Sequence, residues 1–437
     1  WVEIDLAAFQ HNLQLLKEYL RPGQSFMQIV KADAYGHGAK EIAEIAMAQG
    51  AVYLGVANLE EGKLLRIQGV QAPILILSPS LISEIKQIIR YELSLAITDT
   101  AFAEALSQAA VKADKTVKIH LKLDTGMHRS GIWFEEALDF YNSVSALPGL
   151  EIEGIFSHFA SAENDHEFTR LQETRFSEFV QALPKSPRYV HLSNSSGLIH
   201  GYAAYCNLVR LGIFSFGINT TAKELDLRPV MTFKSTLSQI KDFKAGDSVG
   251  YQREWVAKTS GRYGIVPVGY ADGYDYLLSN KAMVLIDSIM CPVIGRISMD
   301  MITVDISEIL EPRISDEVVL LGEGDPALRA EQIAALYQGS AYELLCQVGR
   351  RARRYYHSKA HILHSSPLAR RDFVSSDFGD SKLSQIISSA LNQRLDSPEI
   401  GELIYREILR TFFYNKDRDV HYRKNFRHEI RFDKSDN

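Results

Sequence analysis

Residues Val117-Lys-Ile-His-Leu-Lys-Leu-Asp124 alternate strictly between apolar and polar side chains. Successive side chains of a β-strand point to opposite faces, so this stretch predicts a strand with His120, Lys122 and Asp124 on one face. In a β-barrel one face meets the surrounding layer and the other points into the lumen. We expect these three polar side chains to point into the lumen, where they need a ligand or a charge network to satisfy them.

Short β-rich runs alternate with amphipathic helical stretches around this segment, which favours parallel βα units. We predict eight strands, at residues 26–32, 52–57, 74–78, 93–98, 117–124, 152–158, 189–194 and 208–216. Helical patterns lie between them, at residues 39–49, 59–67, 101–112 and 168–182. Eight such repeats predict a (β/α)8 TIM barrel over residues 6–225. An open doubly wound sheet is the alternative, but no GxGxxG motif follows the first strand.

The pattern changes after about residue 220, where helical periodicity nearly vanishes and Gly and Asp separate short strands. We predict a mainly β domain at residues 226–356, which residues 1–5 join as a further strand. Its strands are expected at 231–237, 247–249, 262–268, 281–286, 291–297, 301–305 and 317–321, and a helix at 329–336. Residues 357–437 are expected to be a helical extension of unknown role, with helices at 383–395 and 398–413.

The composition excludes several classes of protein. A net charge of −6 gives no reason to expect nucleic acid as a partner. No apolar run approaches the roughly 18 residues that a transmembrane helix needs, so we expect no membrane association. The three cysteines lie far apart and form no CxxC pair, which fits a reducing compartment. We therefore expect a cytoplasmic globular protein.

Chemistry in TIM barrels gathers at the carboxyl ends of the strands. These ends carry Lys31, Asp124, His158, the pair Asn194–Ser195, and Arg210. No His, Asp and Glu set has the spacing of a metal site, and no Ser/His/Asp triad is recognisable. Lys31 could simply be a solvent-exposed lysine at the end of its strand. If it is desolvated and near other cations, it loses its proton more readily and can form a Schiff base with a carbonyl cofactor.

Residues Val30-Lys-Ala-Asp-Ala-Tyr-Gly-His-Gly38 resemble the motif around the lysine that carries pyridoxal 5′-phosphate (PLP) in alanine racemases. Seven further segments resemble the same family in the same order, at residues 121–129, 155–159, 191–195, 209–213, 249–255, 268–274 and 295–300. The resemblance covers about residues 1–356. It implies a PLP-dependent enzyme that interconverts L-alanine and D-alanine and supplies D-alanine for peptidoglycan.

The resemblance also assigns the cofactor site. Lys31 would carry PLP as a Schiff base, and Arg210 would face the pyridine nitrogen, with His158 beside it. Because arginine only donates hydrogen bonds, that nitrogen would stay unprotonated and the ring would be a weaker electron sink. The residues that would hold the phosphate are Tyr35, Asn194, Ser195, Gly212 and Ile213. Arg350 stands about where many relatives have a phosphate-contacting tyrosine.

Two bases on opposite faces of the substrate are implied, Lys31 and Tyr251. Since Tyr251 lies outside the barrel, the resemblance implies that it acts in the active site of a second chain, within a homodimer. A tyrosine needs nearby donors or positive charge to act near neutral pH, and His158 and Arg129 are the candidates.

The resemblance assigns the substrate side as well. Arg129 would lie near the substrate carboxylate, and Lys122 resembles a lysine that is carbamylated in many relatives. The backbone of Met299 and Asp300 would touch the carboxylate, while Tyr270 would narrow the entrance. A racemase for serine or several amino acids would use the same residues. A PLP decarboxylase would instead place a carboxylate at the ring nitrogen, and a non-catalytic PLP-binding protein would lack the β domain.

Overall fold

The computed structural model describes residues 1–349, 351–358 and 361–365. The chain divides into two compact units, Trp1–Leu368 and Ala369–Asn437. The first contains both the barrel and the β-rich part. Arg350 and the helices expected at 383–395 and 398–413 lie outside the described residues.

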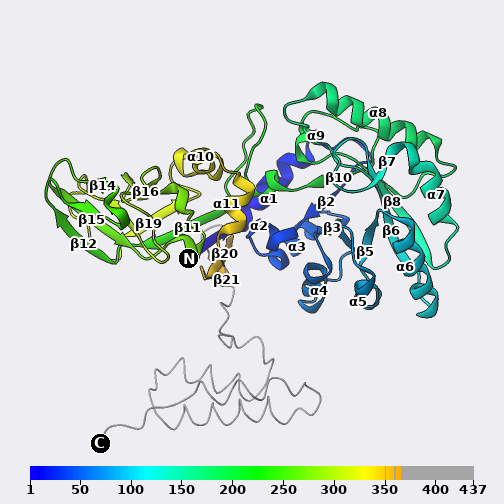
Figure 1. Cartoon of the computed structure of the whole chain (residues 1–437), viewed down its shortest axis with the longest axis horizontal. Helices are drawn as coiled ribbons and strands as arrows, with labels where there is room; N and C mark the ends of the chain where they lie inside the picture. The colour runs from blue at the N-terminus through cyan, green and yellow to red at the C-terminus, as the bar shows by residue number, and fades with distance from the viewer. Residues whose placement is uncertain (350, 359–360, 366–437) are drawn as a thin grey trace, which may run out of the picture. The chain divides into compact units, whose positions relative to one another are not determined.

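Within the described residues, eight parallel strands and their helices form a nearly closed barrel (Figure 1). The strands are β2 (Ser25–Ile29), β3 (Tyr53–Val56), β4 (Ile74–Ile76), β5 (Ser94–Ile97), β6 (Val117–Asp124), β8 (Leu150–Phe156), β9 (Tyr189–His191) and β10 (Leu208–Leu211), with the short β7 (Ile132–Trp133) beside β6. The last strand, β10, pairs in parallel with the first, β2. Hydrogen bonds from Asn207 N to Val190 O (3.2 Å) and from Arg210 N to Ser193 O (3.0 Å) join β9 to β10. This ring confirms the barrel and excludes the open doubly wound sheet.

Polar side chains start several of the barrel helices. Asp5, Asn58, Asp99 and Asp165 each accept backbone N–H groups of the first turn that follows, which have no partner inside the helix. The helices are α1 (Leu6–Lys17), α3 (Ala39–Ala48), α4 (Leu59–Ile67), α5 (Ile85–Arg90), α6 (Thr100–Lys112), α7 (Ala137–Ser145) and α8 (His166–Ala182). The four predicted helices are therefore confirmed, as α3, α4, α6 and α8. In the described part of the chain, no helix has the length and apolar character needed to cross a bilayer.

Three strands end three or more residues earlier than the sequence predicts. The strands expected at 26–32, 189–194 and 208–216 end at Ile29, His191 and Leu211. In each case a short helical element follows almost at once, namely α2 (Lys31–Tyr35), α9 (Ser195–Ile199) and the 3₁₀ turn η3 (Ile213–Phe216). The predicted ends are wrong because the apolar residues beyond them pack in helical turns at the barrel mouth. Four of the candidate residues lie in these turns, namely Lys31, Tyr35, Ser195 and Ile213, and Asn194 and Gly212 directly precede two of them.

The β-rich part contains three sheets. The largest has the order β17-β16-β19-β11-β1-β20-β21, in which β1 (Val2–Asp5) lies between antiparallel β11 and parallel β20. Its other members are β11 (Met231–Thr236), β16 (Met283–Ile286), β17 (Ile289–Pro292), β19 (Glu317–Leu321), β20 (Arg354–Ser358) and β21 (His361–Ser365). The smaller sheets are formed by β12 (Gln239–Phe243), β15 (Gly261–Val266) and β18 (Ile302–Asp305), and by β13 (Ser248–Val249) and β14 (Trp255–Val256).

The sequence did not predict all of these elements. Strand β12 was missed because its residues are mostly exposed and show no apolar alternation. The strand expected at 291–297 is instead Ile289–Pro292, and beyond it only Val293 forms an isolated bridge, to Val304. The helix expected at 329–336 is α10 (Ala330–Ala335), and a second helix, α11 (Ala341–Gln347), follows it and was not predicted.

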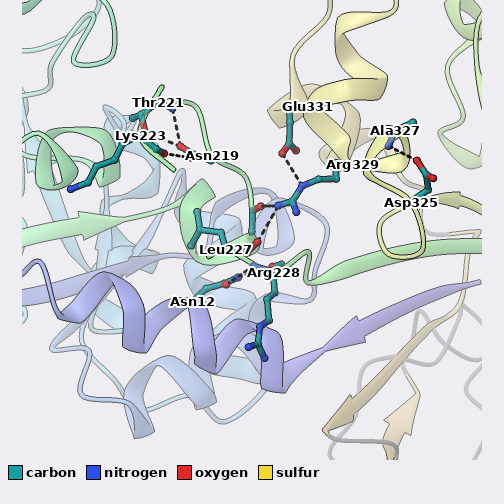
Figure 2. Close-up of polar contacts among 11 residues, drawn as sticks. Asn12, Asn219, Thr221, Lys223, Leu227, Arg228, Asp325, Ala327, Arg329 and Glu331 are labelled. Atoms are coloured by element: carbon teal, nitrogen blue, oxygen red, sulfur yellow. Dashed lines mark hydrogen bonds and ion pairs between the residues drawn. The ribbon is translucent and has the colours of Figure 1, made fainter. Parts of the chain in front are cut away.

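The segment that leaves the barrel after η3 is held by two side chains (Figure 2). Buried Asn12 of α1 donates from Nδ2 to Ser215 O (3.2 Å) and Arg228 O (2.8 Å) and accepts from Arg228 N (2.8 Å). Arg329 donates from Nη2 to Gly217 O (3.0 Å) and Leu227 O (3.1 Å). These bonds fix where the chain passes from the barrel into the β sheets.

The Asn12→Ala variant tests this anchor. It leaves the buried carbonyl of Ser215 and the partly buried backbone groups of Arg228 without these partners, so the free energy of unfolding should fall by about 1–3 kcal/mol. Urea unfolding followed by circular dichroism measures the change. Asn142→Ala, at an exposed position of α7, is the matched control and should change the stability much less. Equal stability of both variants would show that Asn12 is not an anchor.

Candidate active site

The predicted site residues of the barrel lie at one mouth, because all eight strands run in the same direction. Lys31 begins α2 directly after β2, Ser195 begins α9 after β9, and Arg210 lies in β10. His158 follows β8, and Lys122 lies near the end of β6. His120, Lys122 and Asp124 are all buried, and His120 bonds across the lumen to His191 of β9, as the alternation predicts.

Four cationic side chains influence one another at this mouth: Lys31, Lys122, Arg129 and Arg210. Desolvation and then the charge of Arg129 lower the pKa of Lys31, although the side chain reaches solvent at the mouth. Desolvation, Arg129 and Arg210 lower the pKa of Lys122 to about 8. A site with this charge favours anionic ligands and supplies an amine that loses its proton readily.

The turn that carries Lys31 has an unusual backbone. Ala32, Asp33, Ala34 and Tyr35 all have φ between 52° and 54°, the left-handed region that costs L-residues roughly 1–2 kcal/mol each. Glu61 of α4 holds the start of this turn, since its carboxylate accepts from Ala32 N (2.9 Å) and Ala57 N (2.8 Å).

Three further side chains hold the rest of the turn. Nδ1 of buried His37 lies 2.9 Å from the carbonyl oxygens of both Ala34 and Tyr35, so it donates. Asp33 accepts from Ala39 N (2.8 Å), and Arg354 donates from Nε to Gly36 O (2.7 Å). The turn brings Lys31 to the mouth and buries Tyr35 beneath it.

Arg210 is buried and donates from both terminal nitrogens. Nη1 bonds to His191 Nδ1 (3.1 Å) and His191 O (3.1 Å), and Nη2 bonds to Ser157 O, His158 Nδ1 and Leu192 O (each 2.9 Å). Desolvation lowers the pKa of Arg210 to about 10, which leaves it charged at neutral pH. Because a guanidinium only donates, Nδ1 of His158 and of His191 must accept. Each neutral ring therefore carries its hydrogen on Nε2.

A small polar cradle lies between α9, η3 and α2. Ser195 Oγ accepts from Gly212 N (3.1 Å), and a Cβ on Gly212 would lie 3.2 Å from the Tyr35 hydroxyl. Asn194 caps α9 by accepting from Gly197 N (2.8 Å), and Ile213 begins η3 directly after Gly212. The hydroxyls of Ser195 and Tyr35 therefore lie close to the backbone of Gly212, where the family resemblance implies a phosphate site.

Helix α11 contributes a residue that sequence reasoning missed. The ring of Tyr342 lies 6.0 Å from the ring of Tyr35, centroid to centroid, and desolvation raises the pKa of Tyr342 to about 12. The same helix packs against the lysine turn, where a Cβ on Gly36 would lie 2.5 Å from Leu345 O. Tyr342 places a hydroxyl-bearing ring beside the cradle. Arg350, the candidate predicted for this place, lies outside the described residues.

The candidates in the β sheets occupy a different environment. Tyr251 of the turn η4 (Tyr251–Arg253) is 70% exposed, and Tyr270 of the turn η5 (Tyr270–Asp272) and Met299 are also exposed. Asp300 forms an ion pair with Arg351 (2.8 Å). Arg129 is exposed at the barrel mouth.

Comparison with known proteins agrees with this geometry. A barrel of eight parallel strands with polar and charged side chains gathered at its carboxyl-terminal mouth is the architecture of (β/α)8 enzymes. The family model for the alanine racemase N-terminal domain matches residues 4–220, and the model for its C-terminal domain matches residues 230–356.

Individual relatives match most of the chain. Alanine racemases of Syntrophobacter fumaroxidans and Desulfovibrio desulfuricans are 43% and 40% identical, over 82% of this chain and 97% of theirs. The structure of alanine racemase from Clostridium difficile has a TM-score of 0.80 at 31% identity, over 84% of this chain and 98% of that one. The enzyme from Bartonella henselae, solved with covalently bound pyridoxal phosphate, has a TM-score of 0.75 at 27% identity, over 82% of this chain and 99% of that one. The chain belongs to the alanine racemase family and is an enzyme.

The buried histidines predict how stability depends on pH. Burial lowers the pKa of His37 to about 3 and lowers those of His120 and His191 as well. Below about pH 6.5 these histidines are protonated in the unfolded chain but stay neutral in the native state. The free energy of unfolding should therefore decrease as the pH is lowered. Each such histidine contributes about 1.4 kcal/mol per pH unit.

Urea unfolding at intervals between pH 7 and pH 5 measures this slope. The variant His37→Phe keeps an aromatic ring against Phe216. Whether or not it is less stable overall, its free energy of unfolding should change less steeply with pH, by about the contribution of one histidine. A free energy of unfolding that stays constant over this range would contradict the assignment of neutral buried rings.

Proposed function

We propose that the enzyme interconverts L-alanine and D-alanine with PLP bound at Lys31. The observation that carries this proposal is the lysine of lowered pKa next to a buried, donor-only Arg210 in one barrel mouth. We propose the cytoplasm as its location and the supply of D-alanine for peptidoglycan as its role. The three cysteines are all free, which is consistent with a reducing compartment.

The residues of the mouth fit PLP. The phosphate would be held by the cradle of Ser195, Gly212 and Tyr35, together with Asn194, Ile213 and Tyr342; the gap above Gly212 that a Cβ would fill supports this. Lys31 would bind the aldehyde carbon. When bound, PLP withdraws electrons from the substrate Cα and so makes its proton easier to remove.

Arg210 determines how strongly that ring withdraws electrons. Among the described residues its hydrogen bonds use Nη1 and Nη2, so Nε–H is the donor that remains for the ring nitrogen. A nitrogen that accepts from a guanidinium stays unprotonated. Such a ring would withdraw electrons only moderately, which would favour rapid return of the proton to Cα over side reactions. His158, fixed by Arg210 with hydrogen on Nε2, offers a second donor at the mouth.

Two groups would exchange the proton at Cα. Lys31 acts on one face, and its lowered pKa makes the neutral amine accessible. Tyr251 acts on the other. Its exposed position on the β-rich part supports the proposal that it serves the barrel of a second copy in a homodimer. Exposed Tyr270 would narrow the entrance in the same interface.

Arg129 would bind the substrate carboxylate, assisted by the backbone of Met299 and Asp300. Lys122 lies close enough to Arg129 to feel its charge, and two adjacent cations repel. With a pKa of about 8, the Lys122 amine is partly neutral near physiological pH and can react with CO2 to form an anionic carbamate. Such a carbamate would attract Arg129 and hold it in place.

Incubation of the purified protein with PLP and L-alanine in D2O tests the activity. We expect an absorbance band of bound PLP, borohydride fixation of the cofactor to Lys31 by mass spectrometry, and D-alanine deuterated at Cα. Lys31→Ala should abolish fixation and turnover. Release of CO2 would instead identify a decarboxylase, and a broad preference for serine would revise the substrate.

Mixed dimers test whether Tyr251 serves a second chain. Lys31→Ala and Tyr251→Phe are each expected to be nearly inactive. If sites are shared, unfolding and refolding the two variants together should restore about a quarter of wild-type activity, because half of the dimers then contain one intact site.

The matched control is the double variant refolded with wild-type chain. Its mixed dimers contain no intact shared site, so only wild-type homodimers should be active. Mixtures of the two single variants that stay inactive would show that Lys31 and Tyr251 act within one chain, or that Tyr251 is not a base.

A further inference from the structure

A line of polar side chains runs from Arg210 at the mouth into the barrel lumen. Arg210 Nη1 lies 3.1 Å from His191 Nδ1, and His191 Nε2 lies 2.9 Å from His120 Nδ1. His120 Nε2 lies 3.8 Å from a carboxylate oxygen of Glu153. All four side chains are buried and come from the strands β10, β9, β6 and β8.

The direction of every hydrogen bond in this line follows from Arg210, its first residue. Arg210 can only donate, so His191 Nδ1 accepts and His191 donates from Nε2. His120 Nδ1 must then accept, and its hydrogen lies on Nε2. The described residues place no hydrogen-bond partner on His120 Nε2, and the charge it faces is that of Glu153. The donors all point away from the mouth and towards a carboxylate.

Glu153 is an anion in this environment. Burial alone would raise the pKa of Glu153, but neighbouring His120 and hydrogen bonds from Lys118 (2.8 Å) and Tyr53 (2.7 Å) outweigh burial and hold it at about 2. The carboxylate thus terminates the line with a permanent negative charge.

The surrounding backbone leaves room for this line. A Cβ on Gly154 would lie 2.3 Å from His120 Nδ1, the atom that bonds to His191. The ring of Phe156 stacks on His191 with centroids 4.7 Å apart and planes 6° apart. Barrel lumens are usually filled by Val, Ile and Leu, and a buried ionic line adds little net stability over apolar packing. Its presence therefore suggests a role other than stability.

We infer that Glu153, His120 and His191 are positioning residues for Arg210. Together they fix His191 in the tautomer that accepts from Nη1, and this keeps the guanidinium in one orientation with Nε–H available to the ligand. The reverse tautomer would place two donors against each other over 3.1 Å and would push Arg210 aside. The inference rests on the proposed function, in which Arg210 faces the ring nitrogen of PLP.

Neutron diffraction from a crystal of the wild-type holoenzyme tests the hydrogen positions directly. We expect deuterium on Nε2 and none on Nδ1 of both His191 and His120, and an ionised Glu153. Deuterium on His191 Nδ1, or a protonated Glu153, would overturn the inference. This test does not depend on any variant being able to fold.

Two variants test the consequence for catalysis. Glu153→Gln can donate to His120 Nε2 and so permits the reverse tautomer, while Gly154→Ala forces His120 away from His191. We expect each to lower kcat roughly tenfold or more with less than twofold change in KM, the usual scale for loss of an outer partner. In their histidine 15N NMR spectra, the pyridine-type signal of His191 Nδ1 should weaken.

Ser94→Ala is the matched control. Ser94 is buried and its hydroxyl contacts Tyr53 (2.7 Å), which bonds to Glu153, but Ser94 is not a member of the line. It should lower thermal stability with kcat unchanged within twofold. Equal kcat in Glu153→Gln, Gly154→Ala and Ser94→Ala would refute the positioning role. A wild-type protein that neither binds PLP nor racemises alanine would refute the proposed function instead, while the neutron result would still report the tautomers.

Discussion

The left-handed turn from Ala32 to Tyr35 determines where the reactive amine lies. Four consecutive L-residues in this conformation would unwind in an isolated peptide, since each costs roughly 1–2 kcal/mol. The turn persists because Glu61 bonds to the backbone of Ala32 and Arg354, far away in the sequence, bonds to that of Gly36, directly after the turn. A standard strand ending would carry Lys31 onward in the direction of β2, whereas this turn folds the chain back so that Tyr35 lies beneath the mouth. Strain at the site is thus offset by contacts that span the barrel and the β sheet.

The same mouth holds four cationic side chains, and their mutual repulsion does not stabilise the fold. Lys31, Lys122, Arg129 and Arg210 each disfavour protonation of their neighbours, and this repulsion remains in the folded chain unless an anion enters. An anionic cofactor and a substrate carboxylate would both relieve it, so their binding should stabilise the native state by linkage.

Sequence patterns predicted the barrel because alternation and βα spacing are local properties. The strand Val117–Asp124 and the helix Leu59–Ile67 have the predicted bounds. The patterns failed where tertiary contacts override local preference. Nothing in the sequence of Ala32–Tyr35 predicts a left-handed backbone, since alanine normally favours a right-handed helix. The predicted first strand therefore extends beyond the observed one. Tyr342 was missed because its proximity to Tyr35 depends on how two distant segments pack.

Arg210 and Tyr251 lie on parts of the fold that differ in rigidity, and their proposed roles differ accordingly. In the proposed mechanism Arg210 presents its Nε–H in one direction. It lies on barrel strand β10, and its Nη1 and Nη2 groups are engaged by backbone or imidazole acceptors. The proposed role of Tyr251 requires it to approach a ligand bound by another chain, and Tyr251 lies on an exposed turn. A second base on the barrel would lie on the same side of the ligand as Lys31, because both would come from the ends of parallel strands. Access to the opposite face therefore favours a group from outside the barrel, and an exposed tyrosine on the β-rich part meets that requirement when a second copy docks.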